Sequence, residues 1–153
     1  GIPVVTAAPL GLGTAVVSFA PGGMSFEDYF GWDDSDELEM SIRFLVGLSP
    51  AMLQRGYIVD ETRVNLAEHR GPSSIAACQL CAGVAAVEVL KLLLGRGGVR
   101  LAPWATQFDA YRMRLVRTWR PWGYRNPLQR LMIMLLKVRL KAMVQRASKR
   151  SAP

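Results

Sequence analysis

Two short apolar runs open the chain and predict strands. Residues 2–8 are β-branched and apolar without alternation, a pattern typical of a strand covered on both faces. A turn containing Pro and Gly at residues 9–13 separates this run from residues 14–20, which predict a second strand ending at Pro21. Because the connection is short, the two strands most simply pair antiparallel. Since the chain begins on a strand and without Met, we expect further sequence upstream of Gly1.

The rest of the front half predicts an aromatic loop and short helices. Residues 24–32 are rich in aromatic side chains, and we expect them to form a packed loop. The acidic run 33–36 offers acceptors for the first N–H groups of a helix, which we expect to extend to about residue 46. A shorter helix ended by Gly56 and a third one at residues 60–68 follow.

The clearest predicted element is a helix over residues 75–94. Ser73 and Ser74 precede it as caps, and Gly95 ends it. The helix is small and apolar almost all round, and its strongly polar residues are Gln79, Glu88 and Lys91. This composition predicts a buried helix whose small residues let another backbone approach closely.

The back of the chain predicts further strands and a last helix. Residues 99–101 and 106–111 are short strand candidates, and residues 112–119 alternate apolar with basic side chains, apart from two positions. We therefore expect a half-exposed strand with a basic outer face. Residues 121–127 predict a linker and residues 128–147 a helix with a basic end.

Charge divides the chain. Residues 1–95 hold five basic and eleven acidic residues, a net charge of −6, whereas residues 96–153 hold fourteen basic residues and one acid, a net charge of +13. The back third is therefore expected to meet nucleic acid, an acidic lipid surface or the acidic front of its own protein. The predicted basic surface consists of Arg112, Arg114, Arg117, Arg120, Lys137 and Lys141.

Two cysteines are the candidates in this sequence for metal ligation or nucleophilic chemistry. Cys78 and Cys81 form one CxxC pair, and the single histidine is His69, so the four ligands of a structural zinc site are not present and zinc is not expected. A thiol at a helix start can be a nucleophile, which makes the pair weak catalytic candidates. The favoured interpretation is that both are small buried residues. With so few cysteines we expect a reducing, cytoplasmic location.

Several stretches together resemble the superfamily of ThiF, MoeB and ubiquitin-activating enzymes. Residues 2–11 look like the strand that follows the family's nucleotide-binding half, and residues 14–23 resemble the next strand. Residues 71–95, which close on Glu88-Val89-Leu90-Lys91-Leu92-Leu93-Leu94-Gly95, look like the family's long central helix, and residues 107–119 are similar to its closing strands. The resemblance covers residues 1–120.

The resemblance implies an α/β fold: the C-terminal part of a Rossmann-like ThiF-type mixed sheet with a buried central helix. Residues 121–153 would add a linker and a basic, hydrophobic C-terminal helix. The implied activity is adenylation, in which the C-terminal carboxylate of a ubiquitin-like or sulfur-carrier protein attacks the α-phosphate of ATP.

By this resemblance, the family's parts that bind ATP and Mg²⁺ would belong to sequence preceding Gly1. The resemblance therefore implies no cofactor-binding residue in this chain, which alone would be inactive. It also implies a homodimer and a channel for the carrier's tail, which Ser73 and Ser74 could face.

Two other functions stay open at this point. The first is a non-catalytic module whose basic C-terminal region binds acidic lipid or nucleic acid. The second concerns the C-terminal helix alone, which could pack on its own protein or on a sister subunit.

We expect no membrane span, because the candidate run at residues 131–136 is six residues long and a span takes about 20. We also expect the isolated chain to self-associate, since half a sheet leaves an open edge and an apolar face uncovered.

Overall fold

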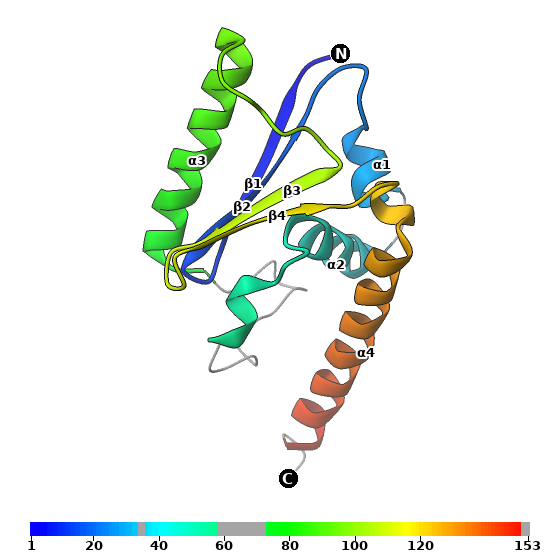
Figure 1. Cartoon of the computed structure of the whole chain (residues 1–153). Coiled ribbons are helices and arrows are strands. Elements are labelled where there is room, and N and C mark those ends of the chain that lie inside the picture. Colours follow the sequence, from blue (N-terminus) through cyan, green and yellow to red (C-terminus); the bar gives the residue numbers. More distant parts are fainter. Residues whose placement is uncertain (34–35, 58–72, 151–153) are drawn as a thin grey trace.

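The computed structural model describes residues 1–33, 36–57 and 73–150, with side chains up to residue 139. Its elements form three layers, with one antiparallel sheet between helices (Figure 1). The strands are β1 (Val4–Leu10), β2 (Gly13–Phe19), β3 (Trp104–Asp109) and β4 (Arg114–Trp119). The helices are α1 (Phe26–Phe30), α2 (Glu37–Leu48), α3 (Ile75–Leu94) and α4 (Pro127–Arg150), with short 3-10 helices η1 (Leu53–Gly56) and η4 (Gly123–Arg125).

The sheet has the order β1-β2-β3-β4, and every neighbouring pair is antiparallel. The predicted pairing of the first two strands is confirmed: Val4 lies opposite Phe19 and Leu10 opposite Gly13. A Cβ on Gly13 would collide with the backbone of Phe108, so the close approach of β2 and β3 requires glycine there. The chain thus has an α/β fold, but its described strands form no parallel pair of the Rossmann type.

One face of the sheet packs against α1 and α2. Phe19 makes edge contacts with the rings of Phe26 and Tyr29, and Tyr29 and Phe30 have no exposed surface. The expected aromatic loop is therefore wrong at its centre, because Ser25 caps α1 by accepting the N–H of Asp28. Its aromatic residues lie on a short helix and pack against the sheet.

Helix α2 begins after Asp36, as the acidic run predicted, although the Asp36 side chain makes no capping hydrogen bond. The shorter helix expected next is a single 3-10 turn, η1. The helix predicted at residues 60–68 and His69 both lie outside the described residues. Helix α4 packs on this helical layer, where Ile133 contacts Ile42 and Val46 of α2.

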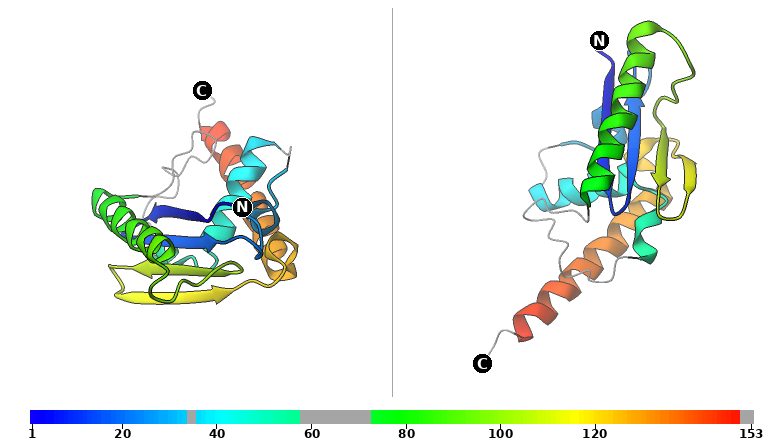
Figure 2. Two further views of the ribbon diagram at one scale, coloured as in Figure 1. Left: turned by 90° about the horizontal axis from the view of Figure 1, so that it is seen from above. Right: turned by 90° about the vertical axis from the view of Figure 1, so that its left-hand side faces the viewer.

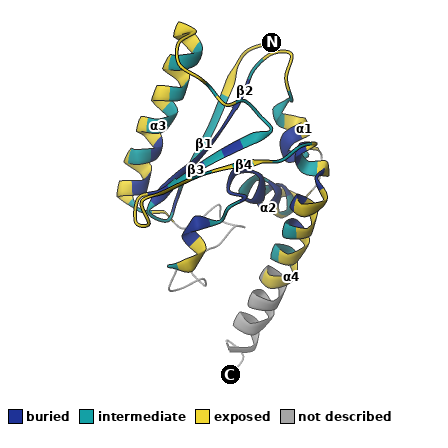
Figure 3. Ribbon diagram, viewed as in Figure 1, coloured by how far each residue is buried: buried dark blue, intermediate teal, exposed yellow. Residues whose placement is uncertain are grey.

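Helix α3 lies on the other face, over β1 and β2 (Figure 2). Its predicted bounds are confirmed: the Ser74 side chain caps it, and Gly95 ends it in the left-handed conformation. Its predicted burial is wrong, because Ala77 and Cys81 are the only buried residues of the helix (Figure 3). The composition is apolar all round, but the described chain supplies a packing surface on one side only.

The predicted basic outer face of residues 112–119 is also wrong. Successive residues of a strand point to opposite faces, and the register places Leu115, Arg117 and Trp119 on the face that carries α3. Arg114 lies on the opposite face, so the arginines of β4 do not share one side. Residues 99–101 contribute an isolated bridge between Leu101 and Ser18 instead of a strand.

Candidate functional site at the turn end of the sheet

Four segments meet at the end of the sheet where its hairpins turn (Figure 1). They are the β1–β2 turn, the β3–β4 turn, the first turn of α3 and Tyr57, which follows η1. The turn residue Gly11 bridges to Ser73, and Ser74 Oγ donates a hydrogen bond of 3.1 Å to the carbonyl of Gly11. The start of α3 is therefore attached to the first hairpin.

Tyr57 and Asp109 form the centre of this cluster. The Tyr57 hydroxyl donates to Asp109 Oδ2 over 2.6 Å and accepts the N–H of Leu12 over 2.9 Å. The other Asp109 oxygen, Oδ1, accepts the N–H of Arg112 over 2.9 Å. Because Asp109 is buried, these bonds replace the water that a carboxylate needs. Together they join both hairpin turns to η1.

Gly11 fits this arrangement for two reasons. Its φ is +61°, and a Cβ there would collide with the Tyr57 hydroxyl. A side chain would therefore both strain the backbone and displace the group that holds Asp109.

A second, fully buried polar group lies beside the first. Gln107 Nε2 donates to Gln54 Oε1 over 2.8 Å, and the Ser49 hydroxyl lies 3.1 Å from Gln107 Oε1. All three side chains are buried. Both polar atoms of the Gln107 amide therefore have a partner, and its bond to Gln54 attaches η1 to β3.

The electrostatics of the cluster favour a structural role for Tyr57. Burial raises the pKa of Tyr57, its bond to Asp109 raises it further, and the N–H of Leu12 lowers it by a smaller amount. The hydroxyl therefore keeps its proton and continues to donate to Asp109. Among the described residues, no group of three or more His, Cys, Asp or Glu side chains could hold a metal ion.

The structure places the predicted sulfur and hydroxyl groups at the start of α3. Ser73 is exposed and Ser74 is half-buried. Cys78 is exposed and Cys81 is buried, and both are free thiols. The expectation that both cysteines are buried is therefore wrong for Cys78, because only the side of α3 that contains Ala77 and Cys81 meets the sheet.

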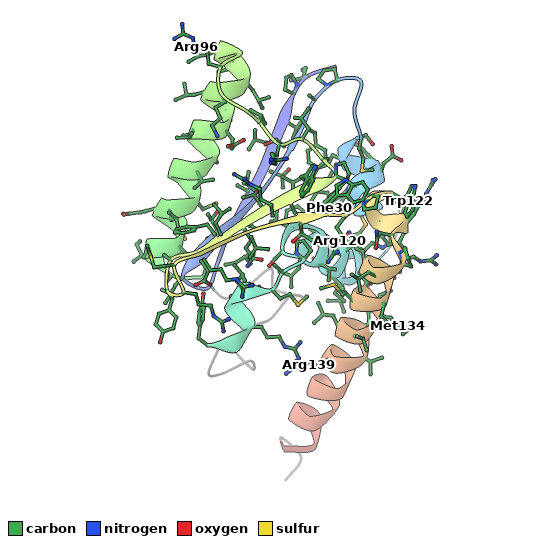
Figure 4. The ribbon with its side chains drawn as sticks, viewed as in Figure 1. Phe30, Arg96, Arg120, Trp122, Met134 and Arg139 are labelled. Carbon is green, nitrogen blue, oxygen red and sulfur yellow. The ribbon has the colours of Figure 1, made fainter. Side chains whose placement is uncertain are left out.

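The predicted basic residues do not form one surface. Arg112, Arg114 and Arg117 are exposed, and the guanidinium of Arg112 lies 5.9 Å from the ring of Tyr57. Arg120 is half-buried and lies in the region between β4, α2 and α4, with its Nε shielded from solvent and without a hydrogen-bond partner among the described residues (Figure 4). Burial lowers its pKa.

Lys137 belongs to an ion-pair network with Glu39 and Arg43. Its Nζ lies 2.7 Å from Glu39 Oε1, which also accepts Arg43 at 2.8 Å. The hydrogen bond from Lys137 lowers the pKa of Glu39; burial opposes this shift and the bonds from Arg43 add to it. Lys141 lies in α4 beyond the described side chains, so its place on a basic surface stays a prediction.

Sequence reasoning missed Tyr57, Gln107 and the buried Arg43. One sequence feature distinguishes Asp109, which is the only acid among residues 96–153. The sequence does not show that the partner of this acid is Tyr57.

Comparison with known proteins found no matching family model and no matching curated protein. Within the described residues, α3 is the one helix long and apolar enough to cross a membrane by length and composition. The segment that could span a membrane by these criteria is therefore α3 and not the run at residues 131–136. A single such helix is weak evidence for a span, and one side of α3 packs on β1 and β2.

Proposed function

We propose that residues 1–120 are the C-terminal part of a ThiF-type adenylyltransferase domain. The complete enzyme would use ATP to activate the C-terminal carboxylate of a ubiquitin-like or sulfur-carrier protein. The supporting observation is that the stretches resembling the family form one unit. β1 pairs with β2, α3 crosses this pair, and β3 and β4 continue the sheet.

In this proposal the nucleotide-binding half precedes Gly1 and extends the sheet. The outer edge of β1 has no strand partner within the described part of the chain, so it offers free backbone groups for a further strand. ATP and Mg²⁺ would bind in that half, where charge on the phosphates must be offset. A Rossmann-like mixed sheet would then exist only in the complete domain.

The turn end of the sheet is the proposed wall for the carrier's tail. Ser73 is exposed there, and the hydrogen bonds of Ser74 to Gly11 and of Tyr57 to Leu12 hold the surrounding backbone in place. Cys78 presents an exposed thiol within the first turns of α3. If a thioester forms in this chain, Cys78 is the cysteine we expect to carry it, because Cys81 is buried.

The experiment is exchange of labelled pyrophosphate into ATP by the complete protein in the presence of its carrier. We expect Ser73→Glu to raise the KM for the carrier without changing that for ATP, because the new carboxylate repels the carrier's carboxylate tail. Leu38→Glu is the matched control, since it adds the same charge at an exposed position of α2 on the other face. The proposal fails if the upstream sequence lacks a strand, a Gly-rich loop and a helix in that order.

A second candidate function is a non-catalytic module that binds acidic lipid or nucleic acid. It is favoured by the charges of residues 73–139, which include eleven basic residues and two acids. Both acids have partners: Glu88 forms a salt bridge with Lys91, and Asp109 accepts a hydrogen bond from Tyr57. Binding to DNA and to anionic vesicles across a salt titration separates this function from the first, because phosphate-driven binding weakens steeply with salt.

A further inference from the structure

Helix α4 has two apolar sides, and the described chain covers one of them. On the inner side Ile133 packs against α2, and the buried amide of Gln129 lies next to Gly47. One turn beyond Ile133, Lys137 binds Glu39 of α2. These contacts fix the rotation of α4 about its own axis, and they determine which residues remain on its outer side.

The outer side is a row of exposed apolar side chains, the outer row of α4. Its members are Leu128, Leu131, Met134, Leu135 and Val138, each between 46% and 63% exposed. Four of them recur at spacings of three and four residues, which places them on one side of a helix, and Met134 borders them. Contiguous exposed apolar surface of this kind marks an interaction site. The sequence pattern conceals the row because the inner side of the helix is apolar as well.

Basic side chains flank the outer row. Arg130 and Arg139 are both exposed. With 3.6 residues per turn, Arg139 lies about 70° from the centre of the row on one side, and Arg130 about 110° on the other. Helix α4 contains no acid, and residues 140–153 add four basic residues and no acid. The apolar surface is therefore bordered by positive charge alone.

Trp122 adds an aromatic ring near the start of this row. Its φ of +64° is a left-handed conformation that residues other than glycine seldom adopt. The residue is 67% exposed, so packing within the described chain does not account for its ring. Figure 4 shows Trp122 and Met134 projecting from the same side of the molecule. Tryptophan is enriched at the boundary between membrane and water, where one part of the ring is in an apolar environment and the other in water.

We propose that the outer row of α4, together with Trp122, binds the surface of a membrane that contains anionic phospholipid. The helix lies in the plane of the membrane and does not span it. Its apolar side chains enter the boundary between headgroups and acyl chains, to a depth of about 5–10 Å. The long stems of Arg130 and Arg139 keep their guanidinium groups at the level of the lipid phosphates.

The charges and the apolar row together favour lipid over other occupants. Nucleic acid would pair with the arginines, but its phosphates offer nothing to cover five apolar side chains. In a pair of α4 helices from two copies, the flanking arginines would face each other, because the helix has no acid to pair with them. An anionic bilayer provides both an apolar layer and negative charge.

The first test is flotation of the complete 153-residue chain with vesicles on a density gradient, because bound protein rises and aggregates sink. We expect binding to vesicles of phosphatidylcholine and phosphatidylserine in equal parts, and weaker binding to phosphatidylcholine alone. Leu135→Gln should lower the partition coefficient on the mixed vesicles about 10-fold or more, the factor for one leucine side chain removed from water. Arg130→Gln should lower it about 5-fold, as for one basic residue at an anionic surface.

Leu115→Gln is the matched control for the apolar row. Leu115 is 53% exposed and Leu135 is 58% exposed, but Leu115 lies on β4. The control should bind vesicles as the parent chain does, and circular dichroism should show all three variants folded. Arg130→Gln should leave binding to phosphatidylcholine alone unchanged, which separates the electrostatic contribution from the apolar one.

The second test locates the contact without a polar substitution in the row. In a Cys78→Ser background, Leu135→Cys and Leu115→Cys each carry an environment-sensitive fluorophore, while Cys81 is buried. We expect the emission of the label at position 135 to shift to the blue on the mixed vesicles, and the label at position 115 to keep its emission. Equal shifts at both positions would overturn the proposed orientation.

Three other results would overturn the proposal. They are absence of vesicle binding at low salt, binding of an oligonucleotide but not of vesicles, and a dimer in light scattering that Leu135→Gln dissociates while vesicles do not bind. The second result would assign the basic residues to nucleic acid, and the third would assign the row to another copy of the chain. The inference does not rest on the adenylyltransferase proposal, because flotation is measured without ATP or a carrier and pyrophosphate exchange without a membrane.

Discussion

Removing the Tyr57 hydroxyl tests whether the turn end of the sheet is a single structural unit. Tyr57→Phe keeps the ring, which lies 5.1 Å from the ring of Tyr111, but deletes the donor to Asp109 and the acceptor of the Leu12 N–H. Asp109 is 1% exposed, so water can replace the lost donor only if the cluster opens. A hydrogen bond to a charged group contributes about 1.5–3 kcal/mol. Because Tyr57 is half-exposed, we expect a loss of about 2 kcal/mol in the free energy of unfolding.

The assay is urea denaturation followed by circular dichroism. For a chain of this size, about 2 kcal/mol corresponds to a decrease of about 1 M in the midpoint with an unchanged slope. Tyr111→Phe is the control, since Tyr111 is mostly exposed and surface substitutions usually cost less than about 0.5 kcal/mol. In a double-mutant cycle, Tyr57→Phe and Asp109→Asn should be less than additive. A Tyr57→Phe midpoint equal to that of the parent would refute the cluster as a structural unit.

Three further predictions concern other positions. Gly11→Ala should lower the free energy of unfolding by about 2 kcal/mol or more, because the new Cβ adds a collision with Tyr57 to the strain of a positive φ. Gly22→Ala, where φ is positive but the space is open, should lower it by about 1 kcal/mol. Thermal melts compare the two variants. Gln129→Leu should raise the melting temperature, because the Gln129 amide is buried without a hydrogen-bond partner among the described residues. The folded-state pKa of Glu39 is below its ordinary 4.5, so its stabilisation is present above that pH and is lost as pH falls through the folded pKa. Glu39→Gln should flatten this acid limb in unfolding experiments, and an unchanged limb would contradict the role given to Lys137.

The elements predicted correctly depend on residues that are close in sequence. Ser74 and Gly95 lie immediately beside the helix whose ends they determine, and the turn around Gly11 connects strands that pair directly. The same kind of signal was present for α1 in Ser25 and Gly31. It was missed because the aromatic side chains between them suggested packing without suggesting a helix.

The candidate site could not be predicted because its contacts are distant in sequence. Tyr57 and Asp109 are 52 residues apart, and no spacing rule relates a residue after η1 to the end of β3. Lys137 and Glu39 likewise come together only when α4 packs on α2. Sequence patterns gave the residue types available for such bonds, but the pairs depend on how the helices dock on the sheet.

The exposure of α3 is not explained by the described part of the chain alone. A helix that is apolar all round is normally buried, yet within the described chain α3 touches the sheet with one side only. Its composition is explained if the remaining surface is covered by another molecule instead of by its own chain. The open edge of β1 lies in the plane of the sheet, whereas the outer face of α3 points away from that plane. A preceding nucleotide-binding half at the edge of β1 would therefore leave the outer face of α3 open to another molecule.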